Sequence, residues 1–374
     1  DTAHIQEKDA EFVNKRREHR LKHGFGDGVA TPIYTMEDAD HTIPLFRPVA
    51  YHEKFQITPD VSYMPYDAGH ILGSSHIRFT DASGASPLTL AYSGDIGRPG
   101  LPILRDPEQM PPVDYLIMES TYGGRLHKSA KHVVEKLADV VNRTARRGGR
   151  IIVPAFALGR TQQLILMLHE LANQKRIPNI PIFVDSPLAI NVTEVTRKHA
   201  ECFDDETREF LQRGEDPFGF SRLQYVREAA DSKKLNDLHG PFVVISASGM
   251  CESGRILHHL RNNIEDPRNT VLITGFQAAE TLGRKLVEKA KEVRIFGEPV
   301  RVRAEISSLD ELSGHADQAE LMEWIKPLAP GLRKIFLVHG EPTQADTLAK
   351  LLTNAYGVEV YVPKPGQSFE IGTM

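Results

Sequence analysis

Cysteine is scarce in this chain, whose 374 residues include only Cys202 and Cys251. Two cysteines far apart in the sequence cannot form the disulfide framework of a small secreted domain, so we expect a cytoplasmic protein. No apolar run is long enough to span a membrane, and the charged residues 1–18 are not typical of a secretory signal. The composition therefore predicts a globular protein with no membrane partner.

An excess of positive charge is also lacking. The chain has 45 Lys and Arg against 50 Asp and Glu, which gives a formal net charge of −5. Nucleic-acid-binding modules usually show a basic footprint, so this balance argues against a protein that only binds RNA. A nuclease is not excluded, because metal ions supply positive charge at a catalytic site. Any RNA contact is expected to be local, in a lined cleft.

The first third of the chain contains short apolar runs bounded by turn residues, which predict strands. A charged segment, Ile5–His23, precedes them and predicts an exposed helix that ends at a Gly-rich loop. Within this segment, Lys15–Arg20 is expected to be a solvated helix face rather than an RNA contact. The predicted strands are Val61–Tyr66, Leu88–Tyr92 and Tyr115–Met118.

From Lys128 onward, helical stretches alternate with short β-branched runs. This alternation indicates βαβ units and a mainly parallel sheet, so the predicted fold class is α/β. The length is sufficient for two domains. The predicted helices are His132–Arg147, Thr161–Gln174, Ala319–Ile325 and Thr343–Tyr356. The predicted strands are Ile151–Pro154, Ile182–Asp185, Phe242–Ser246, Val271–Thr274, Lys334–Val338 and Val358–Val362.

Five side chains of the metal-binding or proton-transfer type stand at the ends of predicted elements. Active sites of α/β proteins collect at the carboxyl ends of strands, so these positions are informative together. Taken singly, each has a simpler explanation, such as an exposed loop histidine or an aspartate that makes an Asx turn. The five are His70, Asp95, Glu119, His315 and His339.

The motifs around these residues resemble a known family. Gly-His-Ile-Leu-Gly-Ser, Ser-Gly-Asp, Glu-Ser-Thr-Tyr-Gly, Ser-Gly-His-Ala-Asp and Val-His-Gly-Glu occur in the order found in the β-CASP branch of the metallo-β-lactamase superfamily. Pro154–Gln162 and Ser246–Arg255 are similar to further motifs of that branch. The resemblance is greatest to stand-alone bacterial and archaeal RNA-processing members, which are related to the eukaryotic pre-mRNA 3′-end cleavage endonuclease.

This resemblance implies a metallo-β-lactamase αββα sandwich with an inserted β-CASP α/β domain of mainly parallel sheet. We place the first part of the metallo-β-lactamase domain at residues 1–123, the β-CASP domain at 124–305, and the closing part with its RNA-metabolising motif at 306–374. The family's His-x-His-x-Asp-His signature should precede His70, and the sequence contains no such spacing. We therefore expect the first domain to lack its opening part and the metal ligands of that signature.

The resemblance also implies a dinuclear zinc site that hydrolyses RNA phosphodiesters to 5′-phosphate and 3′-hydroxyl ends. His70 would bind the first zinc, Asp95 would bridge both ions, and His339 would bind the second. Glu119 and His315 would be the proton-handling pair. In this scheme His315 protonates the leaving oxygen, and Glu119 fixes its tautomer and supports the imidazolium.

Four residues of the β-CASP segment are candidates for substrate binding. Arg160, at a predicted helix start, can pair with a phosphate through two hydrogen bonds. The small loop that contains Ser246, Ser248 and Gly249 can direct backbone N–H groups to a phosphate, although a tight strand-to-helix turn explains it equally well. Arg255 and Arg284 are weaker candidates of the same kind as Arg160.

Two other functions remain open. The chain could be a catalytically inactive β-CASP homologue or fragment that binds RNA or protein. Alternatively, it could be another metallo-hydrolase of the superfamily, acting on small esters or thioesters. RNA is the expected partner, and a homodimer is possible, although no local sequence signal indicates one.

Overall fold

A computed structural model describes residues 3–4, 6–8, 10–11, 14–15, 29–127 and 132–372. The chain forms two compact units, Asp1–Ala50 and Tyr51–Met374. In the first unit, α2 (Met36–Thr42) begins with a capping box between Thr35 and Asp38. Much of the predicted helix Ile5–His23, including most of Lys15–Arg20, lies outside the described residues. Every helix in the described part of the chain is too short or too polar to cross a lipid bilayer.

The second unit contains a mixed seven-stranded sheet, with the order β1-β2-β3-β4-β5-β14-β15. β3 is antiparallel to both β2 and β4, whereas β4, β5, β14 and β15 are parallel to one another. The strands β2, β4, β5 and β14 therefore run in one direction and end at the same edge of the sheet. The bounds are β1 (Phe55–Gln56), β2 (Val61–Asp67), β3 (Ser75–Asp81), β4 (Leu88–Tyr92), β5 (Tyr115–Glu119), β14 (Lys334–Val338) and β15 (Glu359–Tyr361).

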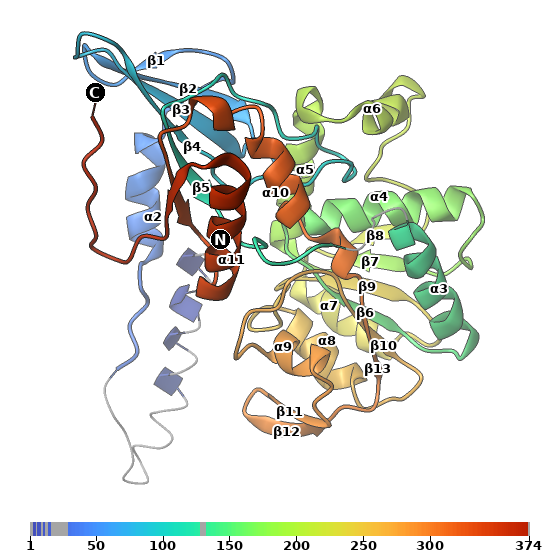
Figure 1. Cartoon of the computed structure of the whole chain (residues 1–374). Coiled ribbons are helices and arrows are strands. Elements are labelled where there is room, and N and C mark those ends of the chain that lie inside the picture. The colour runs from blue at the N-terminus through green and yellow to red at the C-terminus, as the bar shows by residue number, and fades with distance from the viewer. Residues whose placement is uncertain are drawn as a thin grey trace. The chain divides into compact units, whose positions relative to one another are not determined.

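Two helices, α10 (Gln318–Ile325) and α11 (Pro342–Tyr356), pack against this sheet (Figure 1). Alternate strand residues such as Leu116 and Leu337 join Trp324 and Leu348 in one buried cluster. Burial of each side chain of this size stabilises the fold by roughly 1.5–3 kcal/mol, so this cluster holds the two helices against the sheet. Within the described residues, this lobe contains a single sheet.

The chain leaves the seven-stranded sheet after β5 and returns to it at β14, and the segment between them forms a second lobe. Its six-stranded sheet has the order β13-β10-β6-β9-β7-β8, and every pair is parallel. This confirms the predicted parallel sheet. The strands are β6 (Ile151–Pro154), β7 (Ile182–Val184), β8 (Leu223–Tyr225), β9 (Val243–Ser246), β10 (Thr270–Ile273) and β13 (Glu305–Ser308).

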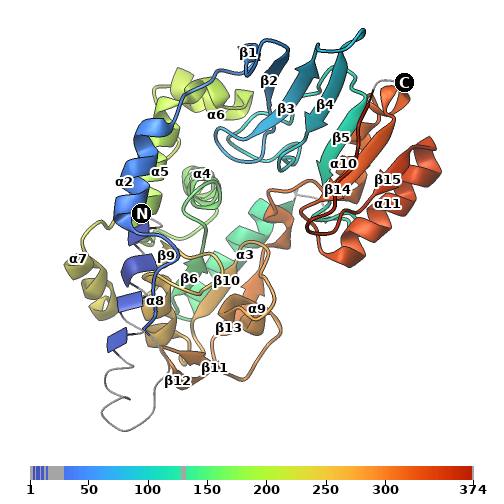
Figure 2. The same cartoon turned by 90° about the vertical axis from the view of Figure 1, so that its left-hand side faces the viewer.

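Helices cover both faces of the six-stranded sheet (Figures 1 and 2). Ile151 and Val153 belong to one buried cluster, and Ile152 belongs to the other, because successive strand residues point to opposite faces. Burial on both faces explains why the strands are continuous apolar runs. On the first face lie α3 (Val133–Arg146), α4 (Arg160–Asn173), α5 (Pro187–Lys198) and α6 (Asp205–Gln212). On the second lie α8 (Ile256–Asn263), α9 (Leu282–Val287) and the hairpin β11–β12 (Glu292–Ile295 and Glu298–Arg301).

The elements predicted from residue 60 onward agree with the structure to within one residue at each end. No bounds were predicted for the strands β3, β8 and β13, for the β11–β12 hairpin, or for the helices α5, α6, α7 (Ala229–Lys234), α8 and α9. The parallel direction of the second sheet puts the carboxyl ends of β6, β9 and β10 at one edge, where the loops 155–159, 246–250 and 274–277 begin.

Candidate active site

Four of the predicted site residues stand at one edge of the seven-stranded sheet. His70 lies in the turn after β2, and Asp95 lies shortly after β4. Glu119 is the last residue of β5, and His339 directly follows β14. Because these strands run in one direction, side chains far apart in the sequence meet at their carboxyl ends.

Asp95 lies between two histidines. Its Oδ2 is 3.8 Å from His70 Nε2, and its Oδ1 is 3.2 Å from His339 Nδ1. Each carboxylate oxygen therefore faces a different imidazole, an arrangement in which one carboxylate can serve two neighbouring cations. Two groups of three side chains have ligand atoms that all lie within 4.8 Å of one another: His70, Asp95 and His315, and Glu119, His315 and His339.

The ring of His70 is held in one tautomer. Its Nδ1 lies 3.0 Å from the carbonyl oxygen of Gly314, so this nitrogen carries the proton and donates it. The lone pair is then on Nε2, the atom that faces Asp95. Histidines that bind metals commonly donate their second ring N–H in this way. Burial and the neighbouring His315 lower the pKa of His70, which favours the neutral ring that a metal needs.

A close approach of two loops positions these groups. A Cβ atom at Gly97 would lie 2.2 Å from the backbone of Gly69, so no other residue fits there without a shift. The Gly97 N–H donates to the carbonyl of Ala68 at 2.7 Å, and Gly97 forms a bridge with His315. The loops after β2 and β4 and the segment before α10 are thereby tied together.

Glu119 is a buried carboxylate that holds His315. Its Oε1 accepts a hydrogen bond from the Ile96 N–H at 2.6 Å and lies 3.2 Å from His315 Nδ1. Burial alone would raise the pKa of Glu119, but the hydrogen bond and the charge of His315 lower it. Burial also opposes a charge on His315, but Glu119 outweighs it and raises the pKa of His315. The hydrogen bond therefore keeps a proton on Nδ1, and Nε2 is the atom that can take up or release another proton.

Three residues near this pair were not singled out from the sequence, although they follow the Glu119 strand closely. Thr121 Oγ1 donates to the carbonyl of His339 at 2.9 Å. His127 Nε2 donates to the carbonyl of His315 at 3.1 Å, and the Tyr122 ring packs edge-on against His127 at 4.6 Å. These contacts fix the backbone of both histidines. The only sequence feature that could have indicated these three residues is that they lie in the polar segment directly after β5.

Comparisons with known proteins identify the family of this chain. Residues 161–286 match the family model described as the Beta-Casp domain, and residues 299–363 match the Zn-dependent metallo-hydrolase RNA specificity domain. Ribonuclease TTHA0252 of Thermus thermophilus is 34% identical over 340 residues, which cover 91% of this chain and 76% of that protein. An RNase J-like protein of Methanocaldococcus jannaschii is 32% identical over 342 residues, covering 90% and 77%.

The chain belongs to the β-CASP family of metallo-β-lactamase-fold nucleases. The fold class predicted from the motifs is thereby confirmed: the seven-stranded sheet belongs to the metallo-β-lactamase lobe, and the six-stranded parallel sheet belongs to the inserted β-CASP lobe. The transcription termination factor FttA of Pyrococcus horikoshii is also similar, with 29% identity over 341 residues. The match covers 89% of this chain and 52% of that protein.

Arg160 opens α4 in the β-CASP lobe, on the side that adjoins the candidate site. A small cavity of 20 Å³ is lined by His70, Gly159 and Gln163 among others, which places the helix start beside the site. The Arg160 guanidinium donates to Gln163 Oε1 at 2.6 Å, and no carboxylate of the described residues pairs with it. Burial lowers the pKa of Arg160 to about 10, so it remains a cation at neutral pH.

The other two arginine candidates are paired. Arg255 NH1 lies 2.7 Å from Asp185 Oδ1, and Arg284 Nε lies 2.6 Å from Glu288 Oε1. Their positive charge is already matched within the protein, which leaves Arg160 as the better phosphate ligand of the three.

The loop after β9 uses its side chains for internal contacts. The Ser246 hydroxyl is buried and donates to the Asp185 carbonyl at 2.8 Å, and Ser248 Oγ accepts from the Glu252 N–H at 3.1 Å. The N–H groups of Gly249 and Met250 have no acceptor among the residues that the structure describes. This loop can therefore offer backbone N–H groups, rather than these two hydroxyls, to an anion.

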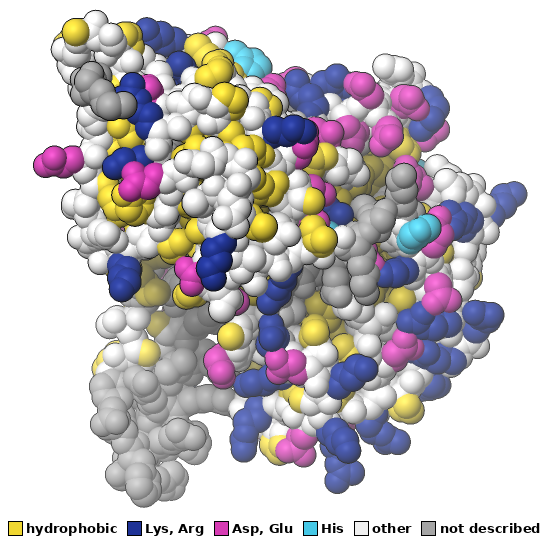
Figure 3. All heavy atoms as spheres, in the orientation of Figure 1, with side chains coloured by type: hydrophobic (Ala, Val, Ile, Leu, Met, Phe, Trp, Pro, Cys, Tyr) yellow, Lys and Arg dark blue, Asp and Glu magenta, His cyan; other side chains and the backbone are white. Residues whose placement is uncertain are grey.

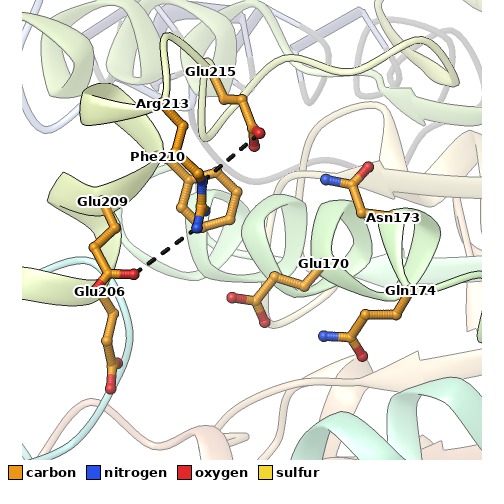
Figure 4. Close-up of a pocket in the computed structure, with 8 residues that line it drawn as sticks. All are labelled: Glu170, Asn173, Gln174, Glu206, Glu209, Phe210, Arg213 and Glu215. Carbon is orange, nitrogen blue, oxygen red and sulfur yellow. Dashed lines mark ion pairs between the residues drawn. The ribbon is translucent and has the colours of Figure 1, made fainter.

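A cavity of 530 Å³ elsewhere on the β-CASP lobe is unsuited to RNA (Figure 4). It is lined by Glu170, Glu206, Glu209 and Glu215, and its one cationic lining residue, Arg213, is near both Glu209 and Glu215. Such an acidic lining repels a polyanion. None of its residues belongs to the candidate site, so cavity size does not identify the catalytic centre.

Proposed function

We propose that this chain is a zinc-dependent ribonuclease that hydrolyses RNA phosphodiester bonds to 5′-phosphate and 3′-hydroxyl ends. The carboxylate of Asp95, which faces His70 with one oxygen and His339 with the other, carries the proposal. Further support comes from relatives named as a ribonuclease and an RNase J-like protein, and from the match to an RNA specificity domain.

The donor atoms fit zinc. Imidazole nitrogen and carboxylate oxygen are common zinc ligands, and His70 presents its Nε2 lone pair on the side of Asp95. His70, Asp95 and His339 would hold the metal at the edge of the sheet. The chemistry that zinc supplies when bound is Lewis acidity toward the phosphate and activation of water near neutral pH.

His315 is suited to protonate the leaving ribose oxygen. Glu119 holds Nδ1–H and raises the pKa of His315, so the ring can carry a second proton on Nε2 near neutral pH. Delivery of that proton to the leaving oxygen prevents the build-up of negative charge as the bond to phosphorus breaks. A positioned general acid of this kind typically accelerates a reaction ~10²–10⁴-fold.

The β-CASP lobe supplies groups that can hold phosphates. The Arg160 guanidinium has no acidic partner among the described residues, and the N–H groups of Gly249 and Met250 lack acceptors there. Both features are typical of phosphate-binding surfaces. Ser246 and Ser248 support the loop that carries these N–H groups.

A local excess of positive charge lies on the β-CASP lobe in spite of the net charge of the chain. Residues 282–303 contain seven Lys or Arg and three Asp or Glu, a local net charge of +4. Figure 3 shows dark blue Lys and Arg side chains crowded over the lower part of the molecule, where β11 and β12 lie. Phosphate contacts by such side chains add affinity that does not depend on RNA sequence.

The state of the two cysteines supports a cytoplasmic location. Cys202 and Cys251 are buried and unpaired, which fits action in a reducing cytosol. A homodimer and the domain limits 1–123, 124–305 and 306–374 stay predictions.

The test is His315→Ala, with His258→Ala on α8 as the matched histidine control. We expect RNA cleavage to slow by roughly 100-fold in His315→Ala while the zinc content per chain is unchanged. Cleavage is measured on end-labelled RNA, and zinc by elemental analysis. Loss of zinc would make His315 a ligand instead of an acid, and unchanged cleavage would remove it from the reaction. Hydrolysis of a small thioester without cleavage of RNA would overturn the ribonuclease assignment.

A further inference from the structure

Two phenylalanine rings are exposed at the carboxyl edge of the β-CASP sheet. Phe156 lies in the loop that begins after β6 and is 44% exposed, and Phe276 follows β10 and is 37% exposed. β6 and β10 are neighbouring parallel strands, so both rings leave the sheet at the same edge. Burying a phenylalanine normally stabilises a fold, so two exposed rings at one functional edge call for an explanation.

Phe276 reaches the catalytic pair through one intervening ring. The centroids of Phe276 and Tyr122 are 6.4 Å apart, and those of Tyr122 and His315 are 6.3 Å apart. Tyr122 follows β5 in the metallo-β-lactamase lobe, so this chain of rings joins the two lobes at the site. Phe276 is therefore within reach of the nucleotides next to a phosphate bound at His315.

Phe156 borders the loop that offers free backbone N–H groups. A Cβ atom at Gly249 would lie 2.8 Å from the Phe156 ring, so the ring lies directly against the backbone of this loop. The Phe156 carbonyl accepts hydrogen bonds from the N–H and the hydroxyl of Thr161, at 3.2 and 2.8 Å. The ring is thus held beside the proposed phosphate-binding atoms, close to the start of α4 and Arg160.

Gln277 ties the loop of Phe276 to the loop after β9, against which the Phe156 ring lies. Its buried side-chain amide donates to the carbonyl of Gly249 at 3.0 Å and to that of Phe276 at 3.0 Å. The surface that carries the exposed rings is therefore fixed before any ligand arrives. Such preorganisation lowers the entropy that is lost on binding.

We propose that Phe156 and Phe276 stack the nucleobases that flank the scissile phosphate of single-stranded RNA. This inference rests on the proposed function and adds a base-binding element to it. Every base has a flat π-face, so aromatic platforms bind single strands with little sequence preference. Paired bases are already stacked in a helix and cannot reach the rings, so the site would select unpaired RNA.

The experiment compares two single-stranded RNAs of about twelve nucleotides, one with all its bases and one with abasic ribose in place of them. Binding is measured by fluorescence anisotropy in EDTA, so that neither RNA is cut. Wild type is expected to bind the base-bearing RNA about tenfold more tightly than the abasic RNA. Phe156→Ala and Phe276→Ala should each lose most of this preference, and Phe276→Trp should keep it.

Leu238→Ala is the matched control. Leu238 is 37% exposed, as Phe276 is, but it precedes β9 and so lies at the opposite edge of the same sheet. A 2-aminopurine base placed next to the cleavage position should be quenched by wild type and not by Phe276→Ala. If both alanine variants keep the base preference, or if they lose affinity equally for the two RNAs, stacking is disproved.

The outcomes separate this inference from the proposed function. A wild-type chain that cleaves RNA, with alanine variants that keep the preference for bases, would overturn the stacking inference alone. A chain that prefers base-bearing RNA but cleaves none with zinc would overturn the ribonuclease assignment and leave the stacking inference standing. No binding of either RNA in EDTA would overturn the stacking inference, and cleavage with zinc would still decide the ribonuclease assignment.

Discussion

Several side chains at the site use one polar atom for a hydrogen bond to another residue of the chain. His70 uses Nδ1 to bind Gly314 and His315 uses Nδ1 to bind Glu119, which leaves Nε2 of His70 for the proposed metal and Nε2 of His315 for the proposed proton transfer. Ser246 commits its hydroxyl to the Asp185 carbonyl. The sequence could predict these residue types at strand ends. It could not predict which atom is already bonded, because the partners lie far away along the chain.

His76 is a buried histidine outside the proposed chemistry, and it makes stability depend on pH. Burial lowers its pKa to about 4 from the ordinary 6.5, although a hydrogen bond to the Ser93 carbonyl opposes the shift. Between pH 4 and pH 6.5, His76 is protonated in the unfolded chain but neutral in the folded chain. Stability is therefore complete above pH 6.5 and falls as the pH drops toward 4, by up to roughly 3 kcal/mol.

We expect His76→Gln to flatten this pH dependence, because glutamine does not titrate and can still donate to the carbonyl. The measurement is the free energy of unfolding in urea at a series of pH values. The difference between the proteins in mildly alkaline buffer gives the packing cost of the substitution and serves as the control. An equally steep loss of stability in the variant would show that other groups cause it.

Among the secondary-structure elements, β7, β9 and α8 are joined through one buried residue, Asp185. Asp185, directly after β7, accepts from Arg255 at 2.7 Å and from His259 at 2.6 Å, and its carbonyl accepts from Ser246. This network fixes the loop that offers backbone N–H groups to phosphate. From the sequence, Arg255 was a weak candidate for a phosphate ligand, because nothing in the pattern links it to position 185.

Arg255→Met is expected to lower the free energy of unfolding by roughly 3 kcal/mol, because Asp185 would keep a buried charge without its cation. Arg261→Met, in the helix that Arg255 directly precedes, is the matched control. Arg261 lies 3.6 Å from Glu298 in a solvent-exposed pair, so its loss should cost under about 1 kcal/mol. Chemical denaturation of both variants tests this, and equal losses would contradict the assigned role of Asp185.

The hairpin region supplies a prediction about RNA affinity. Lys289 and Lys291 are exposed in the segment of local net charge +4. Reversal of both charges to Glu should weaken RNA binding for all sequences alike. It should also reduce the slope of log affinity against log salt concentration by about one for each phosphate that the protein no longer neutralises. Lys364→Glu, an exposed lysine outside this segment, should change neither quantity in anisotropy titrations.

For the whole molecule, the sequence predicted the buried central strands of the two sheets better than the partly exposed strands and the loops that follow the strands. Strands such as Ile151–Pro154 are buried on both faces, and their continuous apolar pattern identified them. β3 was missed because His76 and Arg78 interrupt its apolar residues. The family motifs predicted which strand ends carry chemistry, but the exposed Phe156 and Phe276 resemble ordinary loop residues until the parallel strands place them together.

Zinc should stabilise the metallo-β-lactamase lobe in particular, because its proposed ligands follow β2, β4 and β14, which are distant in the sequence. A ligand that binds only the folded state at about 100 times its Kd adds roughly 2.7 kcal/mol, so we expect the melting temperature to rise by a few degrees. The single tryptophan, Trp324, is buried in this lobe and reports its unfolding by fluorescence. His339→Ala should remove most of the shift, whereas His258→Ala should retain it. A zinc-induced rise that survives in His339→Ala would place the metal elsewhere.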